Sequence, residues 1–157
     1  MRLFLLWWLL SAALWAQPLW PARVISVSDG DTVKLETQEG IRRVRLDSID
    51  APEKRQPGGR ESRQALRQLL PEGASVQLLP LGQDRYGRTL GQLYLPDGTN
   101  LNVRQVRDGQ AWVFTRYCRD PAFWVPLEQE ARQQKRGLWA GPEPIAPWLF
   151  RHPEKRQ

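Results

Sequence analysis

Three short segments of the chain combine acidic and basic residues at spacings that could support catalysis. Residues 45–53 set an arginine, two aspartates and a glutamate around a strand end that a proline terminates. Residues 28–32 place two aspartates around a glycine, and residues 84–88 supply two arginines. Carboxylates suit a hard cation and guanidinium groups suit a phosphate. Together, the three segments predict metal-assisted hydrolysis of a phosphodiester.

Each segment also has an ordinary structural interpretation. Taken alone, residues 45–53 fit an edge strand whose charged side chains face water, and residues 29–31 fit a common turn. Cys118 and His152 are the only cysteine and histidine, so an internal disulfide is impossible and histidine-based catalysis is disfavoured. Acid–base chemistry would therefore fall to carboxylates.

Length and charge limit the organisation and the partners. A chain of 157 residues suits one domain that can bury a core. Its 23 lysines and arginines exceed 17 acidic residues, which gives a net charge of +6 and favours an acidic polymer or an anionic surface as partner. An exported basic protein that rests on anionic envelope polymers is an alternative supported by charge alone.

The first 16 residues have the layout of a signal peptide. Arg2 provides a positive start, residues 3–15 are nearly all apolar, and small alanines precede a cleavage site expected after Ala16. This apolar run is shorter than the roughly 20 residues that a membrane-spanning helix needs. We therefore expect a single domain over residues 17–157, secreted or periplasmic, with no stable membrane insertion once the leader is removed.

Hydrophobic periodicity predicts a mixed α+β fold. Strands are expected by their alternation at residues 22–27, 32–37, 41–49, 75–79 and 89–95. About three helices are expected: one from about residue 61 to 70, a short one capped by Asn102, and one that becomes regular at about Val125 and runs to Arg136. This order fits a five-stranded Greek-key β-barrel of the OB type. The Pro- and Trp-rich arm from about residue 138 should pack back on the domain without regular structure.

The hairpin centred near residues 39–41 determines which acids meet. It places Asp31 opposite a position between 47 and 50, so Asp31 and Asp50 could share one ion. Strict alternation puts Arg45 and Asp50 on opposite faces of the strand. They can meet only if the strand bulges or ends before Asp50, which Pro52 favours.

The three segments, in this order and near this spacing, resemble the staphylococcal nuclease (thermonuclease) family. The resemblance covers about residues 24–139 and includes the closing residues 135–139. It implies that Asp31, Asp50 and the backbone carbonyl of Ala51 hold a calcium ion, whose remaining ligands would be water and a phosphate oxygen. Many family members have threonine in place of Ala51, and a carbonyl ligand should not depend on that side chain.

The same resemblance implies roles for other residues. Arg45 and Arg88 match two arginines that clamp the phosphate, and Glu53 matches the residue that orients or deprotonates the attacking water. Arg85 and Tyr86 match positions that contact the terminal phosphate of the bound nucleotide. Independently of the family, Trp112 is expected in the core, whereas Tyr117 fits a base-stacking surface and a core position equally well.

The resulting expectation is an exported, monomeric, calcium-dependent nuclease. It would hydrolyse single-stranded or locally melted DNA and RNA by in-line attack of water, with little sequence specificity because its contacts are to phosphate and sugar. The alternative is a non-catalytic OB-fold module that only binds nucleic acid. Such a module would not need Arg45, Glu53 and Arg88 together with the two aspartates, so their joint presence favours the enzyme.

Overall fold

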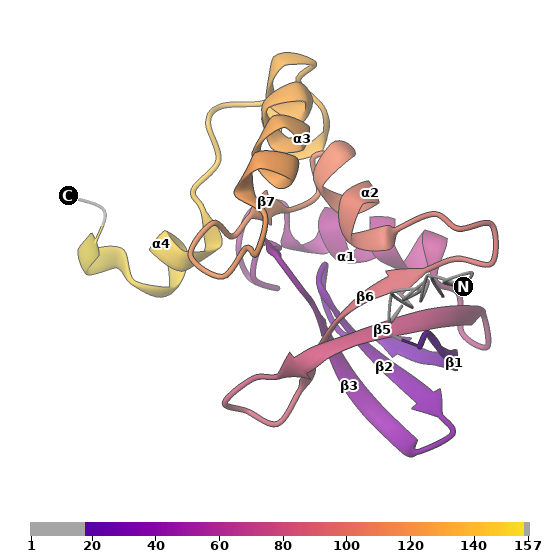
Figure 1. Cartoon of the computed structure of the whole chain (residues 1–157). Helices are drawn as coiled ribbons and strands as arrows, with labels where there is room; N and C mark the ends of the chain where they lie inside the picture. The colour runs from indigo at the N-terminus through magenta and orange to yellow at the C-terminus, as the bar shows by residue number, and fades with distance from the viewer. Residues whose placement is uncertain (1–17, 156–157) are drawn as a thin grey trace, which may run out of the picture.

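The computed structural model describes residues 18–155 and contains a closed β-barrel (Figure 1). Its five strands are β1 (Trp20–Val27), β2 (Thr32–Thr37), β3 (Gly40–Leu46), β5 (Ser75–Gln83) and β6 (Thr89–Tyr94). Their order around the barrel is β1-β2-β3-β6-β5, and β5 pairs with β1 to close it. All these pairs are antiparallel except β3 with β6, which is parallel. The predicted OB-type barrel of an α+β protein is confirmed.

The barrel interior follows from the alternation in the strands. In β2 and β3, the apolar residues Val33, Leu35, Val44 and Leu46 are at most 1% exposed, while their neighbours in sequence include charged side chains. Strands with this alternation bury one face and leave the other toward water. The register Thr32↔Arg45 in the β2–β3 hairpin places the start of β2 next to the end of β3.

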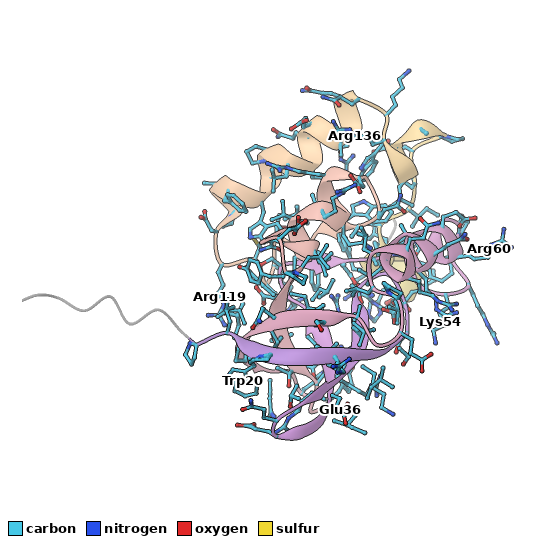
Figure 2. The ribbon with its side chains drawn as sticks, turned by 90° about the vertical axis from the view of Figure 1, so that its right-hand side faces the viewer. Trp20, Glu36, Lys54, Arg60, Arg119 and Arg136 are labelled. Carbon is cyan, nitrogen blue, oxygen red and sulfur yellow. The ribbon has the colours of Figure 1, made fainter. Side chains whose placement is uncertain are left out.

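Helices cover one end of the barrel. They are α1 (Gly59–Leu69), α2 (Leu101–Arg107), α3 (Pro121–Gln133) and the short α4 (Pro147–Arg151), with two 3-10 turns at Gly137–Ala140 and Pro153–Lys155. Residues 18–155 thus hold one α-helix more than expected. Figure 2 shows this separation: Arg136 lies at the helical end, whereas Trp20 and Glu36 lie on the barrel. No helix of this part of the chain has the length and apolar character needed to cross a membrane.

The predicted cap of α2 is wrong by two residues. Asn100, in extended conformation, accepts a hydrogen bond from the Val103 N–H at 3.1 Å and begins the helix. Asn102 lies inside the helix and is fully buried, where its amide donates to the carbonyls of Asp47 and Gly91. A cap must precede the first helical residue, and Asn102 instead joins α2 to the barrel.

The predicted late start of α3 is also wrong. The helix begins at Pro121, behind the cap Asp120, and continues through Pro126 to Gln133. A proline inside a helix forfeits one backbone hydrogen bond. Here the apolar face of Trp124, Leu127 and Ala131 is buried on both sides of Pro126, so packing maintains the helix across it.

The end of β3 differs from the expected strand 41–49. The strand stops at Leu46, Ser48 adopts a left-handed conformation with φ 66°, and the chain resumes as β4 (Ile49–Asp50). β4 pairs with β7 (Trp112–Val113) in a separate two-stranded sheet. Because the strand ends at Leu46, before Asp50, the side chains of Arg45 and Asp50 can contact each other.

The C-terminal arm packs on the domain and is more regular than expected. Trp139 contacts Trp112 edge to face at 5.1 Å between ring centroids, and Trp148 stacks on Phe114 at 5.4 Å. The arm contains α4 and the two 3-10 turns, and these aromatic contacts order it locally. The leader expected at residues 1–16 lies outside residues 18–155.

Candidate active site

Arg45 lies at the centre of the candidate site. One guanidinium nitrogen, Nη1, donates to the backbone carbonyls of Leu46 and Ile49, both at 2.8 Å. The other, Nη2, lies 2.9 Å from Asp50 Oδ1 and 3.3 Å from Asp31 Oδ2. The side chain is only 13% exposed. Because β3 ends at Leu46, the chain turns under the guanidinium and brings Asp50 to it.

Asp31 reaches the same place from the β1–β2 connection. Its Oδ2 accepts a hydrogen bond from the Ala51 N–H at 2.6 Å, and its backbone carbonyl accepts one from the Leu46 N–H at 2.8 Å. Gly30 permits this approach, since a Cβ at that position would collide with the side chain of Ser62. Asp31 and Asp50 both contact one nitrogen of Arg45. The hairpin geometry predicts that the two aspartates lie close together, and the break after Leu46 brings Arg45 to them.

The carboxylates repel one another in this buried setting. Burial raises the pKa of Asp50, and the charge of Asp31 raises it further, while hydrogen bonds from Arg151 and the charge of Arg45 oppose the increase. Burial, followed by the charge of Asp31, raises the pKa of Asp29 from 3.8 to about 6. Carboxyl groups with perturbed pKa values cluster at functional sites, so these shifts mark the cluster as a candidate site.

Glu53 is linked to this cluster through Arg151 of α4. Arg151 Nη1 lies 2.7 Å from Glu53 Oε1, and Nη2 lies 2.7 Å from Asp50 Oδ2. The Glu53 side chain is 42% exposed, so it stands at the edge of the site where water has access. The structure thus brings Asp31, Asp50, Arg45 and Glu53 together. Ala51 follows Asp50 in the chain and contacts Asp31 through its backbone N–H.

Arg88 is held on a neighbouring loop. Its Nε donates to Asp84 Oδ2 at 2.7 Å, and Asp84 Oδ1 accepts the backbone N–H groups of Tyr86 and Arg88 at 2.9 Å. The residue after Arg88, Thr89, lies opposite Val44 in the β3–β6 ladder. The backbone of Arg88 is therefore within two residues of Arg45 across the ladder, although its side chain is paired with Asp84.

The predicted substrate-contacting residues lie at two exposed places. Tyr86 is 68% exposed, its hydroxyl accepts a hydrogen bond from Arg85 at 2.7 Å, and the Arg85 guanidinium lies 4.8 Å from its ring centroid. Tyr117 is 63% exposed and its ring lies 5.1 Å from Phe114, so it is not a core residue. Trp112 is 2% exposed, as expected for core packing.

The carboxylate oxygens of Asp31 and Asp50 are compatible with a cation that takes few of its ligands from the protein. Within residues 18–155, no group of three or more histidine, cysteine or acidic side chains converges as a ready-made metal cage. Asp31 and Asp50 do converge, and they supply the hard oxygen atoms that calcium takes. A calcium ion here would complete its shell with backbone carbonyl and water oxygens, for which the exposed edge at Glu53 leaves access.

Sequence reasoning missed two members of the cluster. Asp29 belongs to a recognised motif but was not assigned to the site; its Oδ1 accepts the Asp31 N–H at 3.1 Å and orders the loop. Arg151 was placed only in the arm. It is separated from Asp50 by 101 positions, and no local pattern in the sequence connects the two.

Comparison with known proteins gives consistent similarities. The sequence profile described as "Staphylococcal nuclease homologue" matches residues 43–141. A protein named uncharacterized endonuclease from Escherichia coli is 48% identical over 130 residues, which cover 83% of this chain and 84% of that relative. A micrococcal nuclease from Shigella flexneri is 37% identical over 150 residues, which cover 88% of this chain and 86% of that relative. An uncharacterized endonuclease from Haemophilus influenzae is 39% identical over 134 residues, 85% of this chain and 74% of that relative.

Proposed function

This chain belongs to the staphylococcal nuclease family and is a nuclease, and we propose that it is an exported, calcium-dependent enzyme that hydrolyses phosphodiester bonds of DNA and RNA. The observation that carries the proposal is the convergence of Asp31, Asp50 and Arg45 at the end of β3, with Glu53 at the edge of the same site. The proposed reaction is in-line attack of water on a backbone phosphorus.

Asp31 and Asp50 are the proposed calcium ligands, with the backbone carbonyl of Ala51 as a third. When bound, calcium would supply Lewis-acid stabilisation of charge on the phosphate. The convergence of the Asp31 and Asp50 carboxylates at one nitrogen of Arg45 supports this assignment.

Arg45 and Arg88 are the proposed phosphate clamps. Charge accumulates on the equatorial phosphate oxygens in the transition state, and preorganised guanidinium groups stabilise it at low cost in reorganisation. Arg45 meets this requirement through its two bonds to backbone carbonyls, which fix its plane. Arg88 is oriented by Asp84 and would exchange part of that contact for the phosphate.

Glu53 is the proposed residue that orients or deprotonates the attacking water. It is a carboxylate that lies at the water-accessible edge of the site and is connected to Asp50 through one guanidinium. General-base action of this kind typically contributes two to four orders of magnitude in rate, as an order-of-magnitude estimate. Glu53 would thereby act on the water, and Asp50 would hold the metal.

The substrate is proposed to be single-stranded or locally melted nucleic acid. Arg85 and Tyr86 would contact a terminal phosphate, and the exposed ring of Tyr117 would stack on a base. These contacts carry little information about base identity, so low sequence specificity follows. The net charge of +6 favours such a polyanion. A secreted or periplasmic location is proposed from the signal-peptide layout of residues 1–16.

One experiment tests the calcium requirement and checks that the protein cleaves nucleic acid as well as binding it. The full-length protein is mixed with a fluorescent single-stranded oligonucleotide in calcium or in excess chelator, and cleavage is followed with time. We expect cleavage in calcium and none in chelator, with activity restored when calcium is added back. Full cleavage in chelator would contradict the calcium assignment, and binding without cleavage in calcium would favour the non-catalytic module.

A further inference from the structure

The C-terminal helix α4 places a cation on the two acids that catalysis needs. Arg151 Nη2 lies 2.7 Å from Asp50 Oδ2, and Nη1 lies 2.7 Å from Glu53 Oε1 and 3.3 Å from Asp50 Oδ1. The Asp50 side chain is 2% exposed, whereas the Arg151 side chain is 37% exposed. A buried carboxylate is thus neutralised by a side chain that comes from the surface, 101 positions away.

This contact and a calcium ion compete for the same atoms. Arg45 Nη2 already occupies one side of Asp50 Oδ1, and Arg151 bonds to both oxygens of that carboxylate. An ion bound to Asp50 needs at least one oxygen lone pair, and it would repel a guanidinium held at hydrogen-bond distance. Arg151 also engages Glu53, which must be available to water. The three hydrogen bonds leave about one lone-pair site on the Asp50 carboxylate, so the closed arm and a bound calcium ion oppose one another through charge repulsion.

The arm is attached in a way that permits release. Figure 1 shows α4 at the edge of the molecule, at the end of an extended connection that follows the 3-10 turn at Gly137–Ala140. Beyond Arg151, its attachments include the stack of Trp148 on Phe114 and the bond from Gln56 to the Ile145 carbonyl at 2.5 Å. A cavity of about 490 Å³ lies between this arm and α3. Release would give up the packing of Pro147, which is buried, and of Trp148 and Leu149 against Trp112 and Trp139. Because α4 lies at the edge of the molecule, it can open locally without unfolding the barrel.

We propose that residues 147–151, here called the strap, form an autoinhibitory device in which Arg151 occupies the cation position and calcium binding releases it. The inference rests on the proposed function, since it takes Asp50 as a calcium ligand and Glu53 as the residue that acts on water. In the absence of calcium, the strap covers the site and offsets part of the negative charge of Asp31, Asp50 and Glu53. Its release frees the ligand and the water-activating acid in one step.

The test compares calcium binding by three full-length proteins, measured by titration calorimetry without substrate. They are the wild type, Arg151→Ala, and Lys155→Ala as a control that removes one positive charge from an exposed position in the same arm. A strap closed about nine-tenths of the time weakens apparent affinity about tenfold. We therefore expect Arg151→Ala to bind calcium about tenfold more tightly than wild type, and Lys155→Ala to match wild type.

A second measurement uses the wild type alone and does not depend on how the variants fold. The backbone N–H groups of Leu149 and Phe150 bond to the Ala146 carbonyl in the closed strap, so hydrogen exchange in a peptide covering the strap reports on its release. Calcium should accelerate this exchange while exchange in the barrel strands stays unchanged or slows.

The outcomes separate this inference from the proposed function. Equal calcium affinity of the wild type and Arg151→Ala, or unchanged exchange in the strap on calcium binding, would overturn the strap while the calcium site remained. Weaker binding by Arg151→Ala would also overturn it, by making Arg151 an organiser of the site. If none of the three proteins binds calcium, the calcium assignment fails, and the strap as a calcium-released device fails with it.

Discussion

Replacing either Arg45 or Arg88 by lysine should lower turnover, but only Arg45→Lys should strongly destabilise the protein. Both residues are proposed phosphate clamps, and lysine keeps the charge while it loses the planar fork. Their surroundings differ. Arg45 donates to the carbonyls of Leu46 and Ile49 and to buried Asp50, whereas the side chain of Arg88 bonds to Asp84.

The expected stability losses follow from these contacts. A lysine at position 45 has donors radiating from one nitrogen, so it cannot satisfy two carbonyls and two carboxylates in the same directions. Leaving buried acceptors without partners costs about 1–3 kcal/mol each, so Arg45→Lys should lower the free energy of unfolding by about 2–4 kcal/mol. Arg88 is 23% exposed and keeps one ion pair with Asp84. Its replacement should cost about 1 kcal/mol or less.

The assay combines urea unfolding with cleavage of a saturating fluorescent oligonucleotide in calcium. Arg104→Lys is the matched control, because Arg104 forms a comparable pair with Asp108 through Nε at 2.6 Å on the surface of α2. This control should keep both stability and turnover. Equal stability of Arg45→Lys and Arg88→Lys would refute the structural role of Arg45, and undiminished turnover in both would remove the two arginines from the transition state.

Other substitutions test the remaining parts of the site. Glu53→Gln removes the charge that would act on water, so turnover should fall by about two orders of magnitude or more. The control Glu61→Gln, on the exposed face of α1, should have no effect on turnover. Normal turnover by Glu53→Gln would exclude the proposed role of Glu53. Gly30→Ala would push a methyl group against Ser62 and should cost about 1–3 kcal/mol in urea unfolding, whereas Gly141→Ala, which has open space around it, should be neutral. Magnesium should replace calcium poorly in the cleavage assay, because it requires a tighter octahedral shell; equal activity with both ions would contradict calcium selectivity.

The barrel was predictable because its signals are local. Alternation in β2 and β3 marks the buried residues, and the glycine turn between them sets the register. The same register brings Asp31 to the end of β3, so the proximity of Asp31 and Asp50 follows from chain geometry. Strand and helix ends were less predictable. Asn100 and Asn102 are the same residue type, and only their position relative to the first helical residue makes one a cap and the other a buried link.

The meeting of Arg45 with Asp50 was only conditionally predictable. It depends on where β3 ends, and the decisive feature is the left-handed conformation of Ser48, with φ 66°. Serine rarely adopts the left-handed conformation, so the presence of a serine at position 48 does not predict this turn. Two hydrogen bonds from Arg45 to the carbonyls on either side of that turn stabilise it. The turn at Ser48 positions the two carbonyls that bind Arg45, and Arg45 in turn stabilises the turn. A pattern of residue types cannot show this mutual dependence.

Asp50 has two guanidinium partners that are held by different means. Arg45 is fixed by the backbone at Leu46 and Ile49, so its place does not depend on the charge of Asp50. The hydrogen bonds described for the Arg151 side chain go to Asp50 and Glu53, the acids that it neutralises. When a third cation enters, repulsion is relieved at the smallest cost by displacing the guanidinium that lacks a backbone anchor. The site can therefore lose Arg151 and keep its shape, whereas it cannot lose Arg45.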